Sequence, residues 1–265
     1  MAVNRIDSTF ARLAADRRKA LVTYICAGDP DLKTTGELVL AIAEAGADLI
    51  ELGVPFSDPL ADGVVNQQAA GRGIASGTTL AGIFDTVRSV RAACQTPIVL
   101  FSYYNPIFHH GLEKFVREAE AAGVDGVLIL DFPPEEAEGA WPATTLKRIS
   151  LIAPTTPAAR IGQITETSSG FIYYVSREGV TGMQAGLAST IPAQVEAIRR
   201  TTTLPVCVGF GISNPEQARA AAVLADGVVV GSAIVHQIAT HAKDGDLVAK
   251  VKTFVASLAD AVHTS

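Results

Sequence analysis

Two acidic side chains, Glu51 and Asp62, have the types and the spacing that acid–base chemistry needs. Glu51 lies in an apolar run, residues 48–52, and Asp62 follows eleven positions later in a loop rich in proline. Burial among aliphatic side chains disfavours an ionised carboxyl group, so we expect the pKa of Glu51 to be raised. Two carboxyl groups in such different surroundings can divide the work of a general acid and a general base. The alternative is a buried structural glutamate followed by an ordinary turn aspartate.

The sequence lacks the residues that several other catalytic mechanisms require at strand ends. The lysines fall in predicted helices, at helix starts or in the C-terminal loop, so a Schiff-base mechanism lacks an amine at a strand end. The five histidines form no metal-binding triad at strand ends. Asp58 together with Glu51 and Asp62 could bind Mg²⁺, which is an alternative to a metal-free acid–base pair.

Glycines follow the last two predicted strands and indicate a phosphate site. The first of these strands ends in Gly209-Phe210-Gly211, and the second ends in Gly231-Ser232. Glycine lets backbone N–H groups approach an anion, and Ser232 would open a short helix whose N-terminus favours phosphate. Either motif alone fits a plain turn, but both together at the end of a barrel predict a phosphate site. A third glycine-rich loop, residues 176–186, is expected to be a mobile lid from which Gly182 donates a further N–H.

Composition and charge exclude several classes of function. The chain has 265 residues, of which 48% are hydrophobic and 18% are charged, and this is enough for a large core. The net charge of −6 is spread along the chain, so we expect no nucleic-acid-binding face. The N-terminus resembles neither a signal nor a transit peptide, and no apolar tract is long enough to span a membrane. The three widely spaced cysteines form no metal or redox motif, and they fit a reducing cytoplasm.

The elements that must position these residues alternate between apolar strands and helices. A joint with an acidic residue recurs before three strands, at Ala45-Gly46-Ala47-Asp48, Ala122-Gly123-Val124-Asp125 and Leu224-Ala225-Asp226-Gly227. Strands without a polar face form parallel sheets, and eight of them predict a closed (β/α)8 barrel, or TIM barrel, with an extra N-terminal helix over residues 4–19. The predicted strands are residues 21–26, 48–52, 98–102, 126–130, 150–153, 171–175, 206–208 and 227–230. We expect one domain over residues 1–265, and an open doubly wound sheet is the alternative.

The chain resembles the tryptophan synthase alpha chain family along nearly its whole length. The most specific motif is Glu51-Leu-Gly-Val-Pro-Phe-Ser-Asp-Pro-Leu-Ala-Asp62-Gly63, and further motifs are Tyr103-Tyr104-Asn105-Pro106, Ser176-Arg177 with Gly179-Val180-Thr181-Gly182, and Gly209-Phe210-Gly211-Ile212-Ser213. The resemblance implies that Glu51 is the general acid/base, that Asp62 binds the indole N–H and that Tyr173 is the active-site tyrosine. It also implies that Thr181 is the lid threonine, and it implies a phosphate cradle and an indole pocket. The cradle residues are Gly182, Gly211, Gly231 and Ser232, and the pocket residues are Tyr24, Phe101, Leu128 and Phe210.

The reaction that the resemblance implies is the retro-aldol cleavage of indole-3-glycerol phosphate to indole and glyceraldehyde 3-phosphate, in tryptophan biosynthesis. No cofactor is expected in this chain, and pyridoxal phosphate is expected only in a partner, the tryptophan synthase beta chain. The expected assembly is a cytoplasmic alpha2-beta2 tetramer, with residues 54–62 and 105–111 as the docking surface. Two alternatives stay open: another phosphate-binding barrel enzyme, such as an isomerase of a related pathway, and a non-catalytic subunit that binds ligand and partner without turnover.

Overall fold

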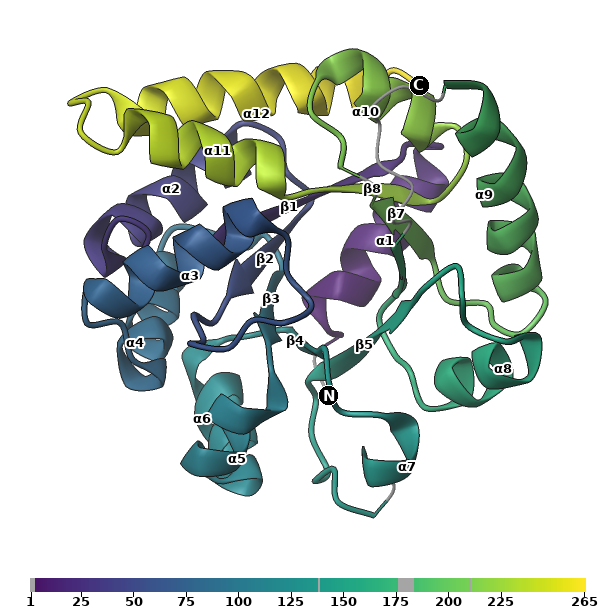
Figure 1. Cartoon of the computed structure of the whole chain (residues 1–265), viewed down its shortest axis with the longest axis horizontal. Helices are drawn as coiled ribbons and strands as arrows, with labels where there is room; N and C mark the ends of the chain where they lie inside the picture. Colours follow the sequence, from purple (N-terminus) through teal and green to yellow (C-terminus); the bar gives the residue numbers. More distant parts are fainter. Residues whose placement is uncertain (1–2, 138, 176–183, 210) are drawn as a thin grey trace.

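The computed structural model describes residues 3–137, 139–175, 184–209 and 211–265, and it contains a closed barrel of eight parallel strands (Figure 1). Each strand pairs with the next one in the sequence, and β8 pairs with β1, with Val229 opposite Val22. The strands are β1 (Ala20–Cys26), β2 (Leu49–Gly53), β3 (Ile98–Ser102), β4 (Gly126–Ile129), β5 (Lys147–Ile152), β6 (Ile172–Val175), β7 (Val206–Gly209) and β8 (Gly227–Val230). The predicted (β/α)8 barrel is confirmed, and the open doubly wound sheet is excluded.

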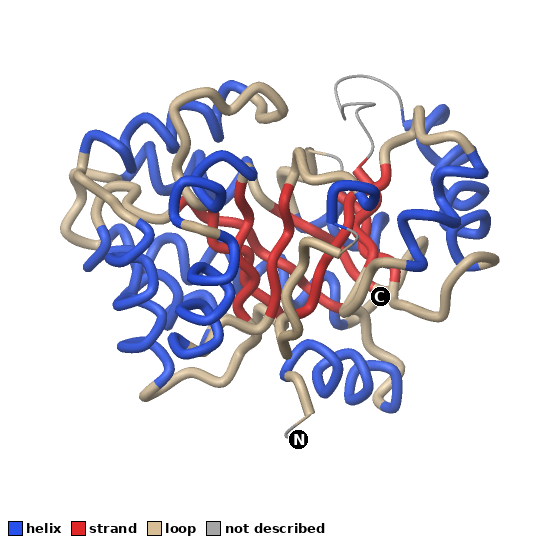
Figure 2. Tube along the Cα trace, turned by 90° about the horizontal axis from the view of Figure 1, so that it is seen from below, coloured by secondary structure: helices blue, strands red, loops and turns tan. Residues whose placement is uncertain are grey.

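Helices surround the barrel and connect its strands (Figures 1 and 2). They are α1 (Arg5–Ala15), α2 (Leu32–Glu44), α3 (Val64–Ala75), α4 (Leu80–Arg91), α5 (Tyr104–His110), α6 (Leu112–Ala122), α7 (Pro134–Ala137), α8 (Ala158–Glu166), α9 (Gln184–Arg199), α10 (Pro215–Ala222), α11 (Ser232–His241) and α12 (Leu247–His263). Local residues fix several of the helix ends. Asp31 accepts a hydrogen bond from the N–H of Thr34 at the start of α2, and Gly123 ends α6 with φ of 90°.

The lower end of the barrel is closed by α1. Strand residues that point inward form one buried cluster with Ile6, Phe10 and Leu13 of α1, and the ring centroids of Phe10 and Phe171 are 5.7 Å apart. Figure 2 shows α1 beneath the strands, and Figure 1 shows it behind the centre of the barrel. Because α1 covers the N-terminal ends of the strands, a ligand has access only at their C-terminal ends, where barrel enzymes bind substrates.

Some element boundaries differ from those predicted. The N-terminal helix ends at Ala15 rather than near residue 19, because Arg17 takes a positive φ of 55° that a helix cannot continue. Strand β5 begins at Lys147, three residues early, so this lysine starts a strand instead of lying in a helix, and its ammonium pairs with Asp7 of α1 at 2.6 Å. The sequence predicts a helix from about Pro192 to Arg200, but α9 begins at Gln184 and continues through Pro192.

One helix was not predicted at all. Helix α5 begins directly after β3, and its Pro106 lies in the first turn, where a missing N–H leaves no hydrogen bond unmade. None of the helices in the described part of the chain combines the length and the apolar character that crossing a membrane requires.

Candidate active site

A cavity of about 620 Å³, here called the mouth cavity, opens at the C-terminal ends of the strands. The loop after β2 and the ends of β1, β3, β6, β7 and β8 border it. A closed barrel brings all strand ends to one face, so residues far apart in the sequence meet there. The side chains and glycines that the sequence singled out and that line this cavity are Tyr24, Glu51, Asp62, Phe101, Tyr173, Gly211, Gly231 and Ser232.

Glu51 projects from β2 into the floor of the mouth cavity and is only 1% exposed. In the sheet it stands between Tyr24 of β1 and Val99 of β3. Its Oε1 atom is buried and has no hydrogen-bond partner among the described residues. Burial raises the pKa of Glu51 to about 8, in agreement with the sequence-based expectation. The carboxyl group therefore carries a proton near neutral pH and can donate it.

Asp62 lies at the rim of the mouth cavity, just before α3, and the side chain of Tyr103 holds it. The hydroxyl of Tyr103 donates to Oδ2 of Asp62 at 2.9 Å and accepts from the N–H of Ala61 at 2.9 Å. Asn66 of α3 lines the same cavity. Burial raises the pKa of Asp62, and the side chains of Tyr103 and Asn66 act against that rise. Asp62 and Glu51 thus have different surroundings, which is the condition for separate roles.

Tyrosine rings form the walls of the mouth cavity, and two glycines make room for them. The rings of Tyr24 and Phe101 meet edge to face, with centroids 5.2 Å apart. A Cβ atom on Gly53 would lie 2.3 Å from the Tyr24 hydroxyl oxygen, and one on Gly209 would lie 2.6 Å from that of Tyr173. Burial, followed by the charge of Glu51, raises the pKa of Tyr173 well above its usual value, so its hydroxyl stays neutral. Such rings suit a flat, apolar ligand.

Part of the mouth cavity presents backbone to the ligand. Gly211 has φ of 65° with open space where a side chain would stand, and Gly231 precedes the first residue of α11, Ser232. The N-terminus of α11 therefore faces the cavity and favours an anion there. The predicted cradle residues Gly211, Gly231 and Ser232 are brought together as expected.

The remaining predicted site residues lie elsewhere. Leu128 is fully buried in the core layer below the mouth cavity, and Phe101 and Tyr173 pack against this layer. Thr181, Gly182 and Phe210 lie outside the described residues. Among the described residues, no three histidine, cysteine, aspartate or glutamate side chains gather as a metal would require, and Asp58 does not line the cavity.

Two polar residues of the site were missed by sequence reasoning. Tyr103 stands in a recognised motif at a strand end, but nothing in the sequence indicates that its hydroxyl reaches Asp62. Asn66 lines the mouth cavity from the first turn of α3, where a polar residue resembles any exposed helix position. A contact between a strand end and a loop residue 41 positions away depends on the path of the loop, which local patterns do not encode.

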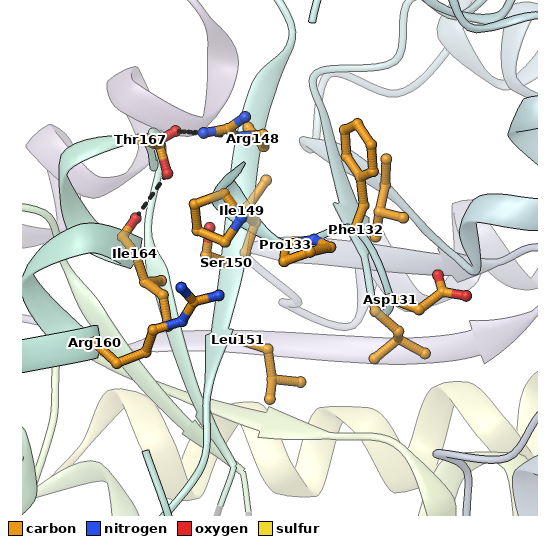
Figure 3. Close-up of a pocket in the computed structure, with 13 residues that line it drawn as sticks. Asp131, Phe132, Pro133, Arg148, Ile149, Ser150, Leu151, Arg160, Ile164 and Thr167 are labelled. Carbon is orange, nitrogen blue, oxygen red and sulfur yellow. Dashed lines mark hydrogen bonds between the residues drawn. The ribbon is translucent and has the colours of Figure 1, made fainter. Parts of the chain in front are cut away.

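A second cavity, of about 280 Å³, lies outside the barrel between β4, β5 and α8 (Figure 3). It exists because α7 has only four residues and leaves this part of the sheet uncovered. Its charged groups already have partners: Arg148 donates to the carbonyl oxygen of Thr167 at 3.0 Å, and Arg160 pairs with Glu135. With these groups engaged, the second cavity lacks the free acid–base pair that the mouth cavity has.

Comparisons with known proteins agree with this geometry. A family model described as tryptophan synthase alpha chain matches residues 10–263. A tryptophan synthase alpha chain from Geotalea daltonii is 54% identical over 260 residues, covering 97% of this chain and 98% of that protein. One from Geobacter sulfurreducens is 51% identical, covering 98% and 99%. The crystal structure of tryptophan synthase subunit alpha from Legionella pneumophila str. Paris superimposes with a TM-score of 0.89 at 37% identity, covering 100% of both chains.

Proposed function

Because this chain belongs to the tryptophan synthase alpha chain family, whose members cleave indole-3-glycerol phosphate to indole and glyceraldehyde 3-phosphate, we propose that Glu51 is its general acid/base and that Asp62 binds the indole N–H. The chain is a carbon–carbon lyase of tryptophan biosynthesis. The observation that carries the two roles is that both carboxyl groups line one cavity, where burial raises the pKa of Glu51 to about 8.

The proton balance of the reaction fits one group with the pKa of Glu51. Protonated Glu51 gives its proton to the indole ring carbon that bears the glycerol chain, and the ring then accepts the electrons of the breaking C–C bond. The carboxylate takes up the proton of the adjacent glycerol hydroxyl as the aldehyde forms, which restores the starting state. Asp62 stays ionised, and it stabilises the positive charge that develops on the indole nitrogen.

The other predicted residues bind and enclose the substrate in this proposal. Tyr24, Phe101 and Phe210 contact the indole above Leu128, and Tyr173 is the third catalytic residue, beside Glu51. The phosphate binds to backbone N–H groups near Gly182, Gly211, Gly231 and Ser232, and Thr181 reaches Asp62 from the lid. The protonated indole is the electron sink, so we propose that this chain works without a metal or organic cofactor.

We propose that the chain works with a tryptophan synthase beta chain in an alpha2-beta2 tetramer, with pyridoxal phosphate in the partner only. The proposed docking surface consists of residues 54–62 and 105–111. Each segment contains an apolar residue open to solvent: Leu60 is 90% exposed and Phe108 63%. Such residues are common at protein interfaces and costly to leave in water. We further propose that residues 1–265 form one domain. We also propose that the protein works in the cytoplasm, because Cys26, Cys94 and Cys207 are all free and buried, as in a reducing compartment.

Single-turnover cleavage of indole-3-glycerol phosphate tests the two roles. Glu51→Gln keeps the side-chain shape but cannot exchange a proton, and it should lower the rate about 10²–10⁴-fold. Asp62→Asn should lower the rate about 10²–10³-fold, as the loss of one preorganised polar group does. Substrate affinity should change little in Glu51→Gln, because the rings and the phosphate cradle supply most binding.

Other outcomes would point to the alternatives. Cleavage at the wild-type rate by Glu51→Gln would refute its role as acid/base. Ligand binding without turnover by the wild-type chain, with and without a beta chain, would indicate a non-catalytic subunit. Conversion of a related phosphorylated substrate in place of cleavage would indicate an isomerase.

A further inference from the structure

A third cavity, of about 460 Å³ and here called the lower cavity, lies at the N-terminal ends of the strands, on the face opposite the mouth cavity. The ends of α1 and α9 and the segments that lead into β1, β7 and β8 border it, and Figure 2 shows α1 on this face. Among the described residues that line it, none belongs to a strand, so it is separate from the barrel interior that α1 closes. Its volume is in the range of small-molecule sites.

Positive charge is concentrated at the lower cavity, although the chain as a whole has a net charge of −6. Arg17, Arg18 and Lys19 are the only run of three consecutive lysine or arginine residues in the sequence, and all three line the cavity together with Arg199. Asp226 is the one acidic group among the described lining residues, and it pairs with Arg199 at 2.8 Å. The lower cavity therefore has an excess of positive charge that the described residues do not neutralise.

The cations before β1 are available to a ligand. Within the described ranges, the side chains of Arg17 and Arg18 make neither an ion pair nor a hydrogen bond, and Arg18 is half-buried. Lys19 donates to the carbonyl oxygen of Ala225 at 2.7 Å and keeps its other donors. Guanidinium groups match phosphate oxygens through paired N–H donors. This set of cations is therefore suited to a phosphate-containing anion.

The backbone at Arg17 is strained, and packing does not explain the residue there. Helix α1 ends in two hydrogen bonds, from the N–H of Arg17 to the oxygen of Ala14 at 3.2 Å and from the N–H of Arg18 to the oxygen of Leu13 at 2.8 Å. This pattern places Arg17 at the left-handed position that glycine usually occupies, and its φ is 55°. It is the one described residue other than glycine with a positive φ. Helix C-termini favour nearby cations, but the neighbouring side chains already provide them without this strain.

We propose that the lower cavity binds a nucleoside diphosphate, with the diphosphate on Arg17, Arg18 and Lys19 and the base against an apolar wall. Leu204 and Pro205, both half-buried before β7, form part of that wall. Cations beside apolar side chains in an enclosed cavity match a ligand that joins an anionic group to a flat ring. The strain at Arg17 then has a use, because it keeps an unpaired guanidinium at the cavity.

Calorimetric titration of the ligand-free chain with ADP at low ionic strength, with NMR of the backbone amide groups, tests the site and its ligand. ADP should shift the amide signals of residues 17–19 and 202–204, whereas shifts confined to the phosphate cradle at Gly231 and Ser232 would overturn the proposal. Adenosine, which lacks the diphosphate, should bind about a hundredfold more weakly than ADP. Pyrophosphate, which lacks the base, should bind about tenfold more weakly. Equal binding of adenosine would refute the role of the cations, and equal binding of pyrophosphate would refute the role of the apolar wall.

Substitutions at Arg17 separate the charge from the strain. Arg17→Gly should weaken ADP binding about tenfold and raise Tm by about 2–4 °C, because glycine takes the left-handed conformation without cost. Arg17→Ala should weaken binding equally but should not raise Tm. Arg18→Gln should also weaken binding about tenfold. The matched control is Arg200→Gln, which removes the same charge next to Arg199 but does not line the cavity, and it should bind ADP as wild type does.

The proposal is overturned if ADP affinity is the same in wild type, Arg17→Gly and Arg18→Gln. It is also overturned if Arg200→Gln loses as much affinity as these variants, because net charge alone would then account for binding. A higher Tm of Arg17→Gly with unchanged ADP affinity would mean that the strained arginine serves no ligand. Arg17 is exposed, so the variants should fold, and the Tm measurement checks that they do.

Discussion

Glu51 has an unusual pKa because β2 carries it into the barrel, where no described residue satisfies its Oε1 atom. The same burial that suits Glu51 to the proposed proton transfer also makes the free energy of unfolding depend on pH. In the unfolded chain a glutamate loses its proton near pH 4.5, whereas in the folded protein Glu51 keeps it up to about pH 8. Between these values the unfolded state binds fewer protons, so the free energy of unfolding falls as pH rises, by up to about 1.4 kcal/mol per pH unit.

We therefore predict that Glu51→Gln changes stability in a pH-dependent way. The variant has no proton to lose, so its free energy of unfolding relative to wild type should increase by a few kcal/mol between pH 5 and pH 8. Urea unfolding at the two pH values measures this, with Glu113→Gln, on the exposed face of α6, as the control for loss of a carboxyl group. An equal difference at both pH values would mean that Glu51 ionises in the folded protein much as it does in the unfolded chain.

The site residues that could be predicted have an unusual local sequence, whereas those that were missed depend on contacts between distant segments. Glu51 and Asp62 could be predicted because an acid in an aliphatic strand and a carboxylate in a rigid loop are locally unusual. The hydrogen bond that Tyr103 makes to Asp62 could not, because it depends on how the loop after β2 folds back over β3. No pattern along the chain encodes that path.

At the scale of elements, the repeated acidic joint has a structural use that its sequence did not reveal. Asp48, Asp125 and Asp226 each stand just before an even-numbered strand. Each carboxylate accepts the backbone N–H of a residue near the start of the preceding strand: Leu21, Ile98 and Val206, at 3.0, 2.9 and 2.9 Å. A side chain thus completes the hydrogen bonding of β1, β3 and β7 where each ladder begins, on the face opposite the mouth cavity.

Asp125 is the one of these three that pairs with two arginines, and we predict that Asp125→Ala destabilises the fold without altering the site. The carboxylate is 3% exposed and pairs with Arg5 at 2.9 Å and with Arg91 at 2.6 Å. Its removal leaves Arg91, whose side chain is only 10% exposed, without its carboxylate partner, which should cost about 3–5 kcal/mol in the free energy of unfolding. The control is Asp85→Ala, which breaks the exposed pair with Arg88 and should cost less than about 1 kcal/mol.

Denaturant unfolding and cleavage per folded molecule together check the Asp125 prediction. Cleavage should be unchanged in the folded fraction, because the lower face does not contact substrate. A loss for Asp125→Ala no larger than that for Asp85→Ala would show that the buried pairs contribute little.

Most of the strands could be predicted, because parallel strands buried on both faces are continuous aliphatic runs bounded by glycine and proline. The beginning of β5 could not, since Lys147 and Arg148 read as the end of a helix although they pair with Gly126 and Val127 of β4. Helix α9 was placed too late because proline is commonest at a helix start, and here the helix continues through Pro192. Tertiary pairing decided both boundaries, and local preference did not.

At the scale of the whole molecule, the two ends of the barrel differ in function. At the N-terminal ends of the strands, α1 and the acidic joints stabilise the fold. Above, the mouth cavity opens beside the proposed docking surface, residues 54–62 and 105–111. Tyr103 connects both segments to the site, because its hydroxyl donates to Asp62 and its backbone directly precedes α5 as the N-cap. A partner that binds both segments can therefore act on the proposed indole-binding carboxylate through one tyrosine.

We predict that a tryptophan synthase beta chain raises the cleavage rate of this chain and that Phe108→Ser weakens the docking without harming the site. Phe108 is 63% exposed on α5 and does not line the mouth cavity, so cleavage by the isolated variant should match wild type. Truncating an apolar anchor at an interface typically costs about 2 kcal/mol or more, so about thirty times more beta chain should be needed for half-maximal activation. Saturating beta chain should restore the full rate.

Val223→Ser is the matched control, because Val223 is 61% exposed at the end of α10, on the lower face. Titrating each variant with beta chain while measuring indole release gives the rate of the isolated chain, the beta-chain concentration for half-maximal activation and the rate at saturation. Equal activation curves for Phe108→Ser and Val223→Ser would place the docking surface elsewhere.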